Sequence, residues 1–193
     1  CMPDGCVTDE QKSEYFNYIY NSFNMLSMLV DDVMDIVDAE HGNYRIQKSN
    51  FKVNDICHNA IQMAELRLLA GVKMYFTSDV DDNYTFDSDG RRIQQVLVNF
   101  LTNACKHTIN GEIHLHVSTN ENPGRLTFSV TDTGEGVPAE TAKDIFERYK
   151  KANNKVQGSG LGLHICSIIA QKLGAEIKLD QNYTDGARFL FII

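Results

Sequence analysis

The sequence predicts an α+β fold in two layers, with a mixed, mostly antiparallel β-sheet, helices packed on one side of it, and a long helix at the N-terminus. Three observations predict it. Apolar residues recur at heptad spacing near the N-terminus, alternate strictly with polar residues in two later segments, and mark one face of three further helical segments. The regular alternation of strands and helices that is typical of a parallel doubly wound sheet is absent.

The composition is that of a soluble globular protein. Of the 193 residues, 42% are hydrophobic and 23% are charged, and no stretch approaches the roughly 20 apolar residues that span a bilayer. The net charge of −8 argues against nonspecific nucleic-acid binding, and no membrane contact by this chain is expected. The five cysteines lack zinc-type pairing, and residues 1–6 have no signal-peptide features, so a cytoplasmic setting with reduced thiols is expected.

The first element is predicted to be a long helix. A capping box at residues 8–11 begins it, while His41 and Gly42 supply a cation and a left-handed cap at its end. Between them, apolar residues alternate at spacings of three and four, as at the a and d positions of a coiled coil: Phe16, Ile19, Phe23, Leu26, Val30, Val33 and Val37. We expect this helix to pack lengthwise against a partner helix; a surface helix of a single globule is the alternative.

The middle of the chain is predicted to contain an extended segment, two helices and a short strand. The pattern predicts an extended segment at 44–53, an amphipathic helix at 54–70 and a strand at 72–77. A second helix is predicted from about residue 89 to residue 107, with its apolar positions on one side. Since residues three and four apart are neighbours on a helix, its polar face carries three side chains together: Asn99, Asn103 and Lys106.

The remaining segments are predicted to complete the sheet. Strict alternation marks strands at 113–117 and 126–130, joined through a hairpin signal at 120–124. A helix from Gly160 to about residue 173, a strand around 175–179 and a last strand at 187–193 follow. We therefore expect a sheet with one buried face and with the helices on that side.

The segment Asp132-x-Gly134-x-Gly136 comes directly after the second alternating strand. A carboxylate held at a strand end is an acceptor only, which suits the exocyclic amino group of adenine and discriminates against the carbonyl group of guanine. The two glycines lack Cβ atoms, so the backbone can approach a planar base closely. Taken alone, the segment is equally consistent with an ordinary turn.

A second glycine-rich segment, Gly158-x-Gly160-x-Gly162, precedes an apolar helical run. Its glycines are expected at a helix N-terminus, where unpaired N–H groups and the helix dipole favour phosphate. The spacing matches neither the dinucleotide-binding fingerprint nor the P-loop. On the preceding helix, Asn103 offers a neutral oxygen for Mg²⁺ and Lys106 a positive charge for phosphate. Together the segments predict one ATP site.

In this order, the motifs resemble the boxes of the catalytic domain of sensor histidine kinases of two-component systems. The resemblance runs from about Leu26 to the last residue and depends on these positions: Asn99-x-x-x-Asn103-Ala-x-Lys106, Asp132-x-Gly134-x-Gly136, Phe146 and Gly158-x-Gly160-x-Gly162, with Asp89, Arg92 and Gln95 ahead of them. That domain has the Bergerat-type ATP-binding fold and belongs to an ATPase superfamily shared with DNA gyrase, heat-shock chaperones and mismatch-repair ATPases.

The resemblance also implies a domain organisation. Residues 43–193 would form the catalytic ATP-binding domain. Residues 1–42 would supply the loop and second helix of the dimerisation and phosphotransfer hairpin, without its first helix. The heptads of the long helix would then pack within a homodimeric four-helix bundle in the full-length protein.

Roles for individual residues follow from the same resemblance. Asp132 would bind adenine, Asn103 would ligate Mg²⁺ with help from Asn99, and Lys106 would contact phosphate. His107 would line the nucleotide, and Phe146 would anchor a lid at about residues 148–157. The remaining positions would let the chain pass the base or receive the phosphates: Gly134, Gly136, Gly158, Ser159, Gly160, Leu161 and Gly162.

Two departures from related sequences bear on the chemistry. Where the gyrase and chaperone branches have a glutamate that activates water, this chain has Asn99. An amide is no general base, so transfer of phosphate to a protein is favoured over hydrolysis. Where many histidine kinases have an arginine near the lid, this chain has Lys151, which can neutralise the γ-phosphate but lacks bidentate geometry.

The phosphoacceptor of this family lies in a His-Glu/Asp-x-x-x-Pro pattern, which none of the six histidines matches. The expected function is therefore donation of the ATP γ-phosphate to a histidine upstream of this fragment, and from there to an aspartate of a response regulator receiver domain. The parent would be cytoplasmic or the cytoplasmic part of a membrane-bound sensor. The alternatives are a hydrolysing ATPase or serine-directed kinase of the same superfamily, and a noncatalytic interaction module with a vestigial nucleotide site. His114 and His116 share the outward face of a strand, which is too few ligands for a metal site.

Overall fold

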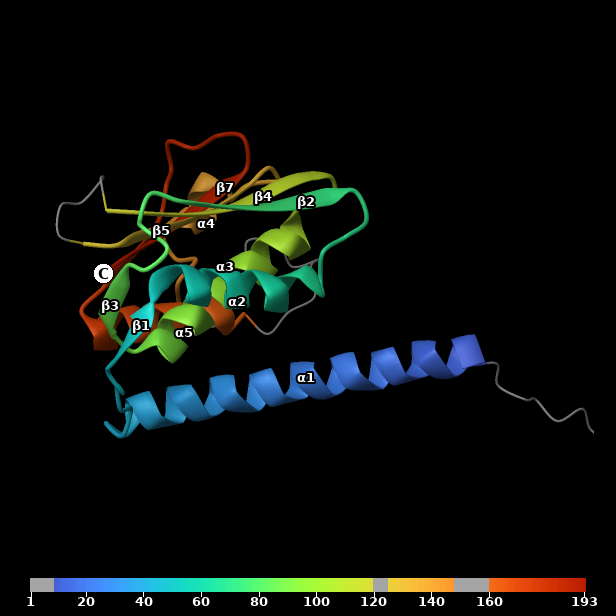
Figure 1. Ribbon diagram of the computed structural model, residues 1–193, viewed down its shortest axis with the longest axis horizontal. Coiled ribbons are helices and arrows are strands. Elements are labelled where there is room, and N and C mark those ends of the chain that lie inside the picture. The colour runs from blue at the N-terminus through green and yellow to red at the C-terminus, as the bar shows by residue number, and fades with distance from the viewer. Residues whose placement is uncertain (1–8, 120–124, 148–159) are drawn as a thin grey trace, which may run out of the picture. The chain divides into compact units, whose positions relative to one another are not determined.

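The computed structural model describes residues 9–119, 125–147 and 160–193 (Figure 1). The chain divides into two compact units, Cys1–Asn43 and Tyr44–Ile193. The described part of the first unit is one long helix with the turn that follows it, and the second unit contains the sheet and the remaining helices. The predicted α+β class is confirmed.

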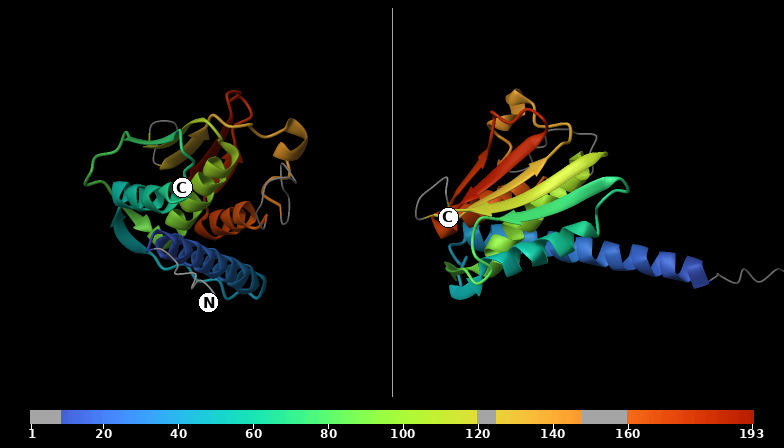
Figure 2. Two further views of the ribbon diagram at one scale, coloured as in Figure 1. Left: turned by 90° about the vertical axis from the view of Figure 1, so that its right-hand side faces the viewer. Right: turned by 45° about the horizontal axis from the view of Figure 1, so that its top comes forward.

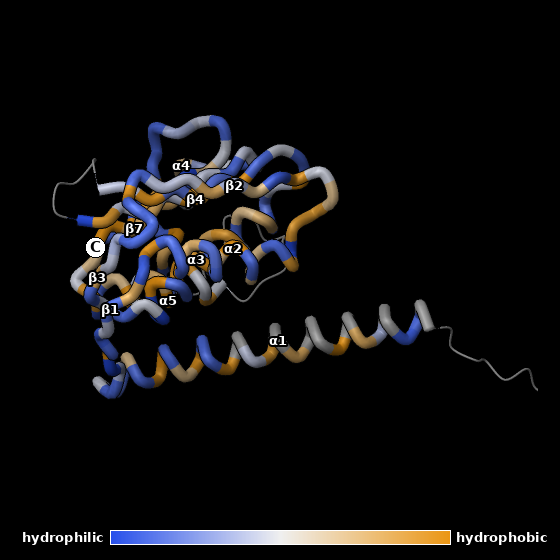
Figure 3. Tube along the Cα trace, in the orientation of Figure 1, coloured by the Kyte–Doolittle hydropathy of each residue, from blue (hydrophilic) through white to orange (hydrophobic). Residues whose placement is uncertain are grey.

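Helix α1 spans Asp9–Glu40 and ends as predicted. The ring nitrogen Nδ1 of His41 lies 2.8 Å from the carbonyl oxygen of Val37, and Gly42 has φ +73°. Hydrophobic residues recur along the whole helix in Figure 3. All the residues at the predicted a and d positions are exposed, between 39% and 69%: Phe16, Ile19, Phe23, Leu26, Val30, Val33 and Val37.

The second unit is built on a five-stranded sheet with the order β2-β4-β5-β7-β6. Its strands are β2 (Val72–Ser78), β4 (Gly111–Ser118), β5 (Thr127–Asp132), β6 (Glu176–Leu179) and β7 (Ala187–Ile192). β2 and β4 are parallel, and the other neighbours are antiparallel. The sheet is therefore mixed and mostly antiparallel, as the sequence predicts.

Three helices cover one face of this sheet: α2 (Val53–Glu65), α3 (Gly90–His107) and α5 (Gly162–Leu173) (Figures 1 and 2). The apolar residues of the two alternating segments are buried beneath them, which confirms the predicted inward face: Ile113, Leu115, Val117, Leu126, Phe128 and Val130. Phe100 of α3 packs on Phe189 of β7 with 5.2 Å between ring centroids. The core thus lies between the two layers.

Helix α3 begins where the sequence predicts because Asp89 caps it. The buried carboxylate accepts a hydrogen bond from Arg92 N through Oδ1, at 3.2 Å, and one from Gln47 N through Oδ2, at 2.8 Å. The guanidinium of Arg92 stacks 4.5 Å from the centre of the Tyr44 ring. Asp89 therefore joins the start of α3 to the segment that begins the second unit.

Some elements differ from the prediction. Strand β1 (Ser49–Lys52) lies within the predicted extended segment 44–53, but the sequence patterns predict neither its antiparallel partner β3 (Thr85–Ser88) nor the one-turn helix α4 (Ala139–Ala142). Each has four residues, which is too short for a periodic pattern to identify. Helix α2 ends at Glu65 rather than at residue 70. The predicted helix is too long because Leu66 continues the apolar spacing, although its side chain is 73% exposed.

Candidate functional site

Asp132 is the last residue of β5 and is 3% exposed. Its Oδ1 accepts hydrogen bonds from the backbone N–H groups of Gly134, at 2.9 Å, and Ala187, at 3.3 Å. Oδ2 makes no hydrogen bond with the described residues. Burial raises the pKa of this carboxyl, and the two backbone bonds and the charge of His107 partly oppose the rise. Oδ1 of Asp132 is thus held by the protein backbone, and Oδ2 can accept a hydrogen bond from a ligand.

The two glycines after Asp132 are required by close backbone contacts. A Cβ atom on Gly134 would clash with the carbonyl oxygen of His107, at the end of α3. Gly136 has φ +69°, and a Cβ atom there would lie 3.0 Å from the carbonyl oxygen of Gly186. The loop after β5 is therefore pressed against α3 on one side and against the segment before β7 on the other.

Gly186 belongs to the same site, although it is not among the predicted site residues. It has φ +155°, and a Cβ atom there would clash with the carbonyl oxygen of Asp132. It directly precedes Ala187, which donates to the Asp132 carboxylate. The Asp185-Gly186 turn pair is the only signal in the sequence that could have pointed to it.

Helix α3 meets the N-terminus of α5 through Asn99. Its Nδ2 donates a 3.3 Å hydrogen bond to the carbonyl oxygen of Gly162, and a Cβ atom on Gly162 would lie 3.3 Å from Asn99 Oδ1. Asn103 and His107 follow at spacings of four and so lie along the same face of the helix. Asn103 makes no side-chain hydrogen bond within the described part of the chain, and Lys106 is exposed. The amide of Asn103 therefore lies between the two contacts that α3 makes with the site loops.

Helix α5 begins at Gly162, whereas the sequence predicts a start at Gly160. Leu161 is its N-cap, and a leucine side chain cannot accept a hydrogen bond. The first N–H groups of the helix are therefore not capped by the side chain of the N-cap residue. Gly160 has φ +71°, and Leu161 is buried. The other predicted residues of this region, Gly158, Ser159 and Lys151, lie outside the described residues, as does the predicted lid at 148–157.

Phe146, which precedes the predicted lid, packs against the core. Its ring packs edge-on against Phe189, with 6.1 Å between centroids. The carbonyl oxygen of Phe146 lies 3.3 Å from Nδ1 of His164, in the first turn of α5. The segment that leads toward residue 148 is thereby held against both β7 and α5.

A further contact closes the site at the end of α3. Nδ1 of His107 lies 2.7 Å from Oε1 of Glu135, and Glu135 N donates to the carbonyl oxygen of His107 at 3.4 Å. His107 is a predicted site residue, whereas Glu135 is not. Glu135 lies between the two glycines, and nothing in the pattern indicates that it would face a residue 28 positions earlier.

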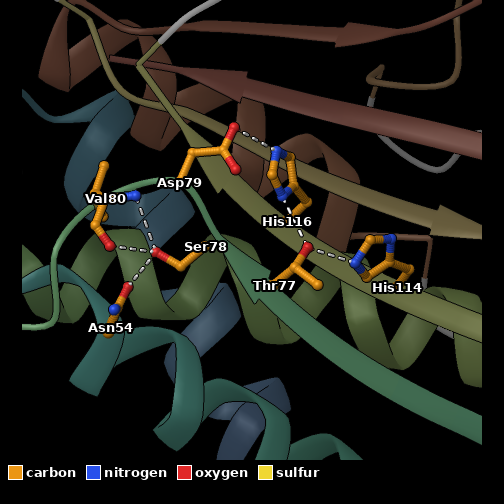
Figure 4. Close-up of polar contacts among 7 residues, drawn as sticks. All are labelled: Asn54, Thr77, Ser78, Asp79, Val80, His114 and His116. Atoms are coloured by element: carbon orange, nitrogen blue, oxygen red, sulfur yellow. Dashed lines mark hydrogen bonds and ion pairs between the residues drawn. The ribbon is translucent and has the colours of Figure 1, made fainter.

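His114 and His116 lie on the helix-free face of the sheet, as Figure 4 shows. The Thr77 hydroxyl oxygen is 2.7 Å from Nε2 of His114 and 2.8 Å from Nδ1 of His116, whose Nε2 is 3.5 Å from Asp79 Oδ2. In the described ranges, no group of three or more His, Cys, Asp or Glu side chains could hold a metal ion. None of the helices described is long and apolar enough to cross a membrane.

Comparisons with known proteins match this site to one family. The profile of the histidine kinase-, DNA gyrase B- and HSP90-like ATPases matches residues 88–193, which include α3, Asp132 and α5. Hybrid signal transduction histidine kinase B of Dictyostelium discoideum is 29% identical over 96% of this chain and 10% of its own length. The sensory/regulatory protein RpfC of Xanthomonas campestris pv. campestris is 30% identical over 95% of this chain and 26% of its own length.

A solved structure is similar over nearly the whole chain. The crystal structure of full-length ShkA in complex with AMPPNP has a TM-score of 0.73 and 27% identity, and the match covers 96% of this chain and 39% of that one. This chain therefore spans well under half the length of each of these three similar proteins.

Proposed function

Because this chain belongs to the family of histidine kinase-, DNA gyrase B- and HSP90-like ATPases, we propose that it is the ATP-binding catalytic module of a sensor histidine kinase. It binds Mg-ATP and donates the γ-phosphate to a histidine outside these 193 residues, from which an aspartate of a response regulator receives it. The similarity to proteins named as signal transduction histidine kinases supports this branch of the family.

The observation that carries the proposal is the arrangement around Asp132. The N–H groups of Gly134 and Ala187 both bind Oδ1, so the carboxylate cannot rotate without losing two hydrogen bonds. Oδ2 is left to accept a hydrogen bond from a ligand. An amino group can donate to it and a carbonyl group cannot, so the site favours adenine over guanine.

The polar face of α3 and the start of α5 fit the phosphate end of the nucleotide. The amide oxygens of Asn103 and Asn99 are suitable ligands for Mg²⁺, with phosphates and waters in the other positions. When bound, Mg²⁺ offsets the charge of the β- and γ-phosphates during transfer. Lys106 and Lys151 would add positive charge, and the first N–H groups of α5 would receive phosphate oxygens.

Asn99 favours transfer over hydrolysis. Its amide cannot take a proton from water, and its Nδ2 already donates to Gly162. The acceptor is then a protein side chain, and in this branch of the family it is a histidine. We propose that the exposed a and d positions of α1 belong to the dimerisation hairpin that presents this histidine in a cytoplasmic homodimer.

Substituting Asp132 with asparagine tests the adenine contact. An asparagine Oδ1 can still accept from Gly134 and Ala187, but the amide NH₂ replaces Oδ2 and opposes the amino group of adenine with another donor. We expect D132N to weaken Mg-ATP binding by about tenfold or more, measured by titration calorimetry. E140Q makes the same chemical change on the exposed helix α4 and should bind as the unaltered chain does. Absent binding by the unaltered chain, or equal binding by D132N, would contradict the proposal.

The direction of phosphate transfer is tested with radiolabelled ATP. The chain should phosphorylate a separately produced hairpin of its parent protein that contains the acceptor histidine, and the product should be acid-labile. Steady release of phosphate in the absence of any acceptor protein would instead identify a hydrolysing ATPase and contradict the role given to Asn99.

A further inference from the structure

We propose that Glu135 is a positioning residue for the nucleotide, and that its contacts with His107 fix the distance between the adenine acceptor Asp132 and the phosphate-side residues of α3. The inference rests on the function proposed above. It concerns how the two ends of one ATP molecule are held at the correct separation.

The contacts themselves are specific. His107 is the last residue of α3, and Glu135 reaches it with both its side chain, at 2.7 Å, and its backbone N–H, at 3.4 Å. The glycine before it brings the loop so close that a side chain at position 134 would clash with the same His107 carbonyl group. The loop after β5 is thus fastened to the end of α3 by two hydrogen bonds made by Glu135, next to the close approach of Gly134.

The two ends of the proposed site depend on this junction because they belong to different elements. Asp132 is part of the sheet, at the end of β5. Asn103 lies one helical turn before His107 on α3, and Asn99 lies one turn further back. A ligand that contacts only adenine needs the first element alone, whereas Mg-ATP needs both in a defined relation.

Charge and exposure make Glu135 suitable for this role. The His107 side chain is 16% exposed and that of Glu135 is 48% exposed, so the carboxylate approaches the imidazole from the solvent side. The charge of His107 in turn favours the ionised form of Asp132. Since Glu135 is not part of the core, its removal should loosen the junction without unfolding the second unit.

The expected signature is selective loss of affinity for ligands that span both ends. E135A should weaken Mg-ATP binding roughly fivefold to tenfold, as for loss of a partly exposed charge-assisted hydrogen bond. Its affinity for adenosine, which contacts only the adenine end, should remain that of the unaltered chain. E135Q should be intermediate, because a glutamine oxygen can still accept a hydrogen bond from the imidazole.

The experiment uses the whole chain and four variants: E135A, E135Q, H107A and the double variant E135A/H107A. Mg-ATP and adenosine affinities are measured by calorimetry and by NMR titration, and the thermal midpoint of each free protein is recorded. E140A serves as a control, because Glu140 lies on neighbouring α4, is exposed, and makes no polar contact with any described residue.

The inference is supported if E135A weakens Mg-ATP but not adenosine, leaves the thermal midpoint unchanged, and has no further effect in the H107A background. Equal Mg-ATP affinity in E135A and the unaltered chain would overturn it while leaving the proposed function intact. Equal losses for both ligands, or a lowered thermal midpoint, would overturn it in favour of a purely structural role. Absence of any nucleotide binding by the unaltered chain would overturn the proposed function, and this inference with it.

Discussion

Burial raises the pKa of the Asp132 carboxyl, so at neutral pH the folded chain holds a charge in a place that disfavours it. A raised pKa means that the carboxyl contributes stability when protonated, and that this contribution is lost as the pH rises through the folded-state pKa. The residue proposed to recognise adenine therefore lowers the stability of the free protein. Binding residues in many enzymes show the same conflict.

We accordingly predict that D132N, which should weaken the proposed nucleotide contact, raises the free energy of unfolding at pH 7. The asparagine keeps the two backbone hydrogen bonds and removes the buried charge. Urea unfolding at pH 7 and at pH 4.5 measures the effect, and the gain should shrink at the lower pH, where the wild-type carboxyl is closer to neutral. A less stable variant at pH 7 would mean that the carboxylate is stabilised by groups other than these.

His114 provides a second prediction, in which stability falls as the pH is lowered, whereas the Asp132 contribution falls as the pH is raised. Burial and the neighbouring His116 lower its pKa from the ordinary value of about 6.5, so the unfolded chain takes up a proton before the folded chain does. Stability should therefore fall as the pH drops below 6.5. H114Q keeps a partner for Thr77 (Figure 4) and should show a shallower loss between pH 7 and pH 5 in urea unfolding. Parallel curves for the two proteins would contradict this account.

The residues of the site differ in how readily the sequence reveals them. Asp132 and Asn103 were predictable because local patterns, a strand end and a helix face, place them. Glu135 and Gly186 were not, since their roles depend on partners far away in sequence: His107 for the first, and the Asp132 carbonyl group for the second. The roles of all these residues in nucleotide binding stay predictions.

Among the elements, α3 contributes most to the site, and its start depends on Asp89. We predict that D89A lowers the free energy of unfolding by about 2 kcal/mol, because it removes the cap of α3 and leaves the N–H of Gln47 without its acceptor. D89N should lose much less, since asparagine is an equally good N-cap. Urea unfolding of both variants provides the comparison, and equal losses would contradict the capping argument.

The accuracy of the predicted elements follows their length and burial. Strands β4 and β5 alternate over the residues that face the core, so the pattern identified them. β1 lies within the predicted extended segment, whereas β3 is four residues long and largely exposed, so no pattern distinguishes it from loop. Helix α2 was overextended because Leu66 and Leu69 keep the apolar spacing although both are exposed.

For the molecule as a whole, the exposed apolar seam of α1 predicts self-association. Seven apolar side chains at a and d spacing are a surface that water disfavours and that a second helix can cover. The chain should associate in sedimentation equilibrium, and the double substitution F23E/V30E should weaken association by about tenfold or more. S27E, at an exposed position outside the seam, is the matched control. A monomer at high concentration would contradict the prediction.

The place of β7 in the sheet has a consequence for how the protein is made. This strand comes late in the sequence but pairs with β5 in the interior of the sheet, and its first residue, Ala187, donates to Asp132. While β6 is being synthesised, Ala187 has not yet been added to the chain, so Asp132 lacks one of the two donors that hold its carboxylate. In a nascent chain arrested before residue 187, only the Gly134 N–H would hold the carboxylate of the proposed adenine acceptor, so such a chain should bind Mg-ATP more weakly than the complete chain.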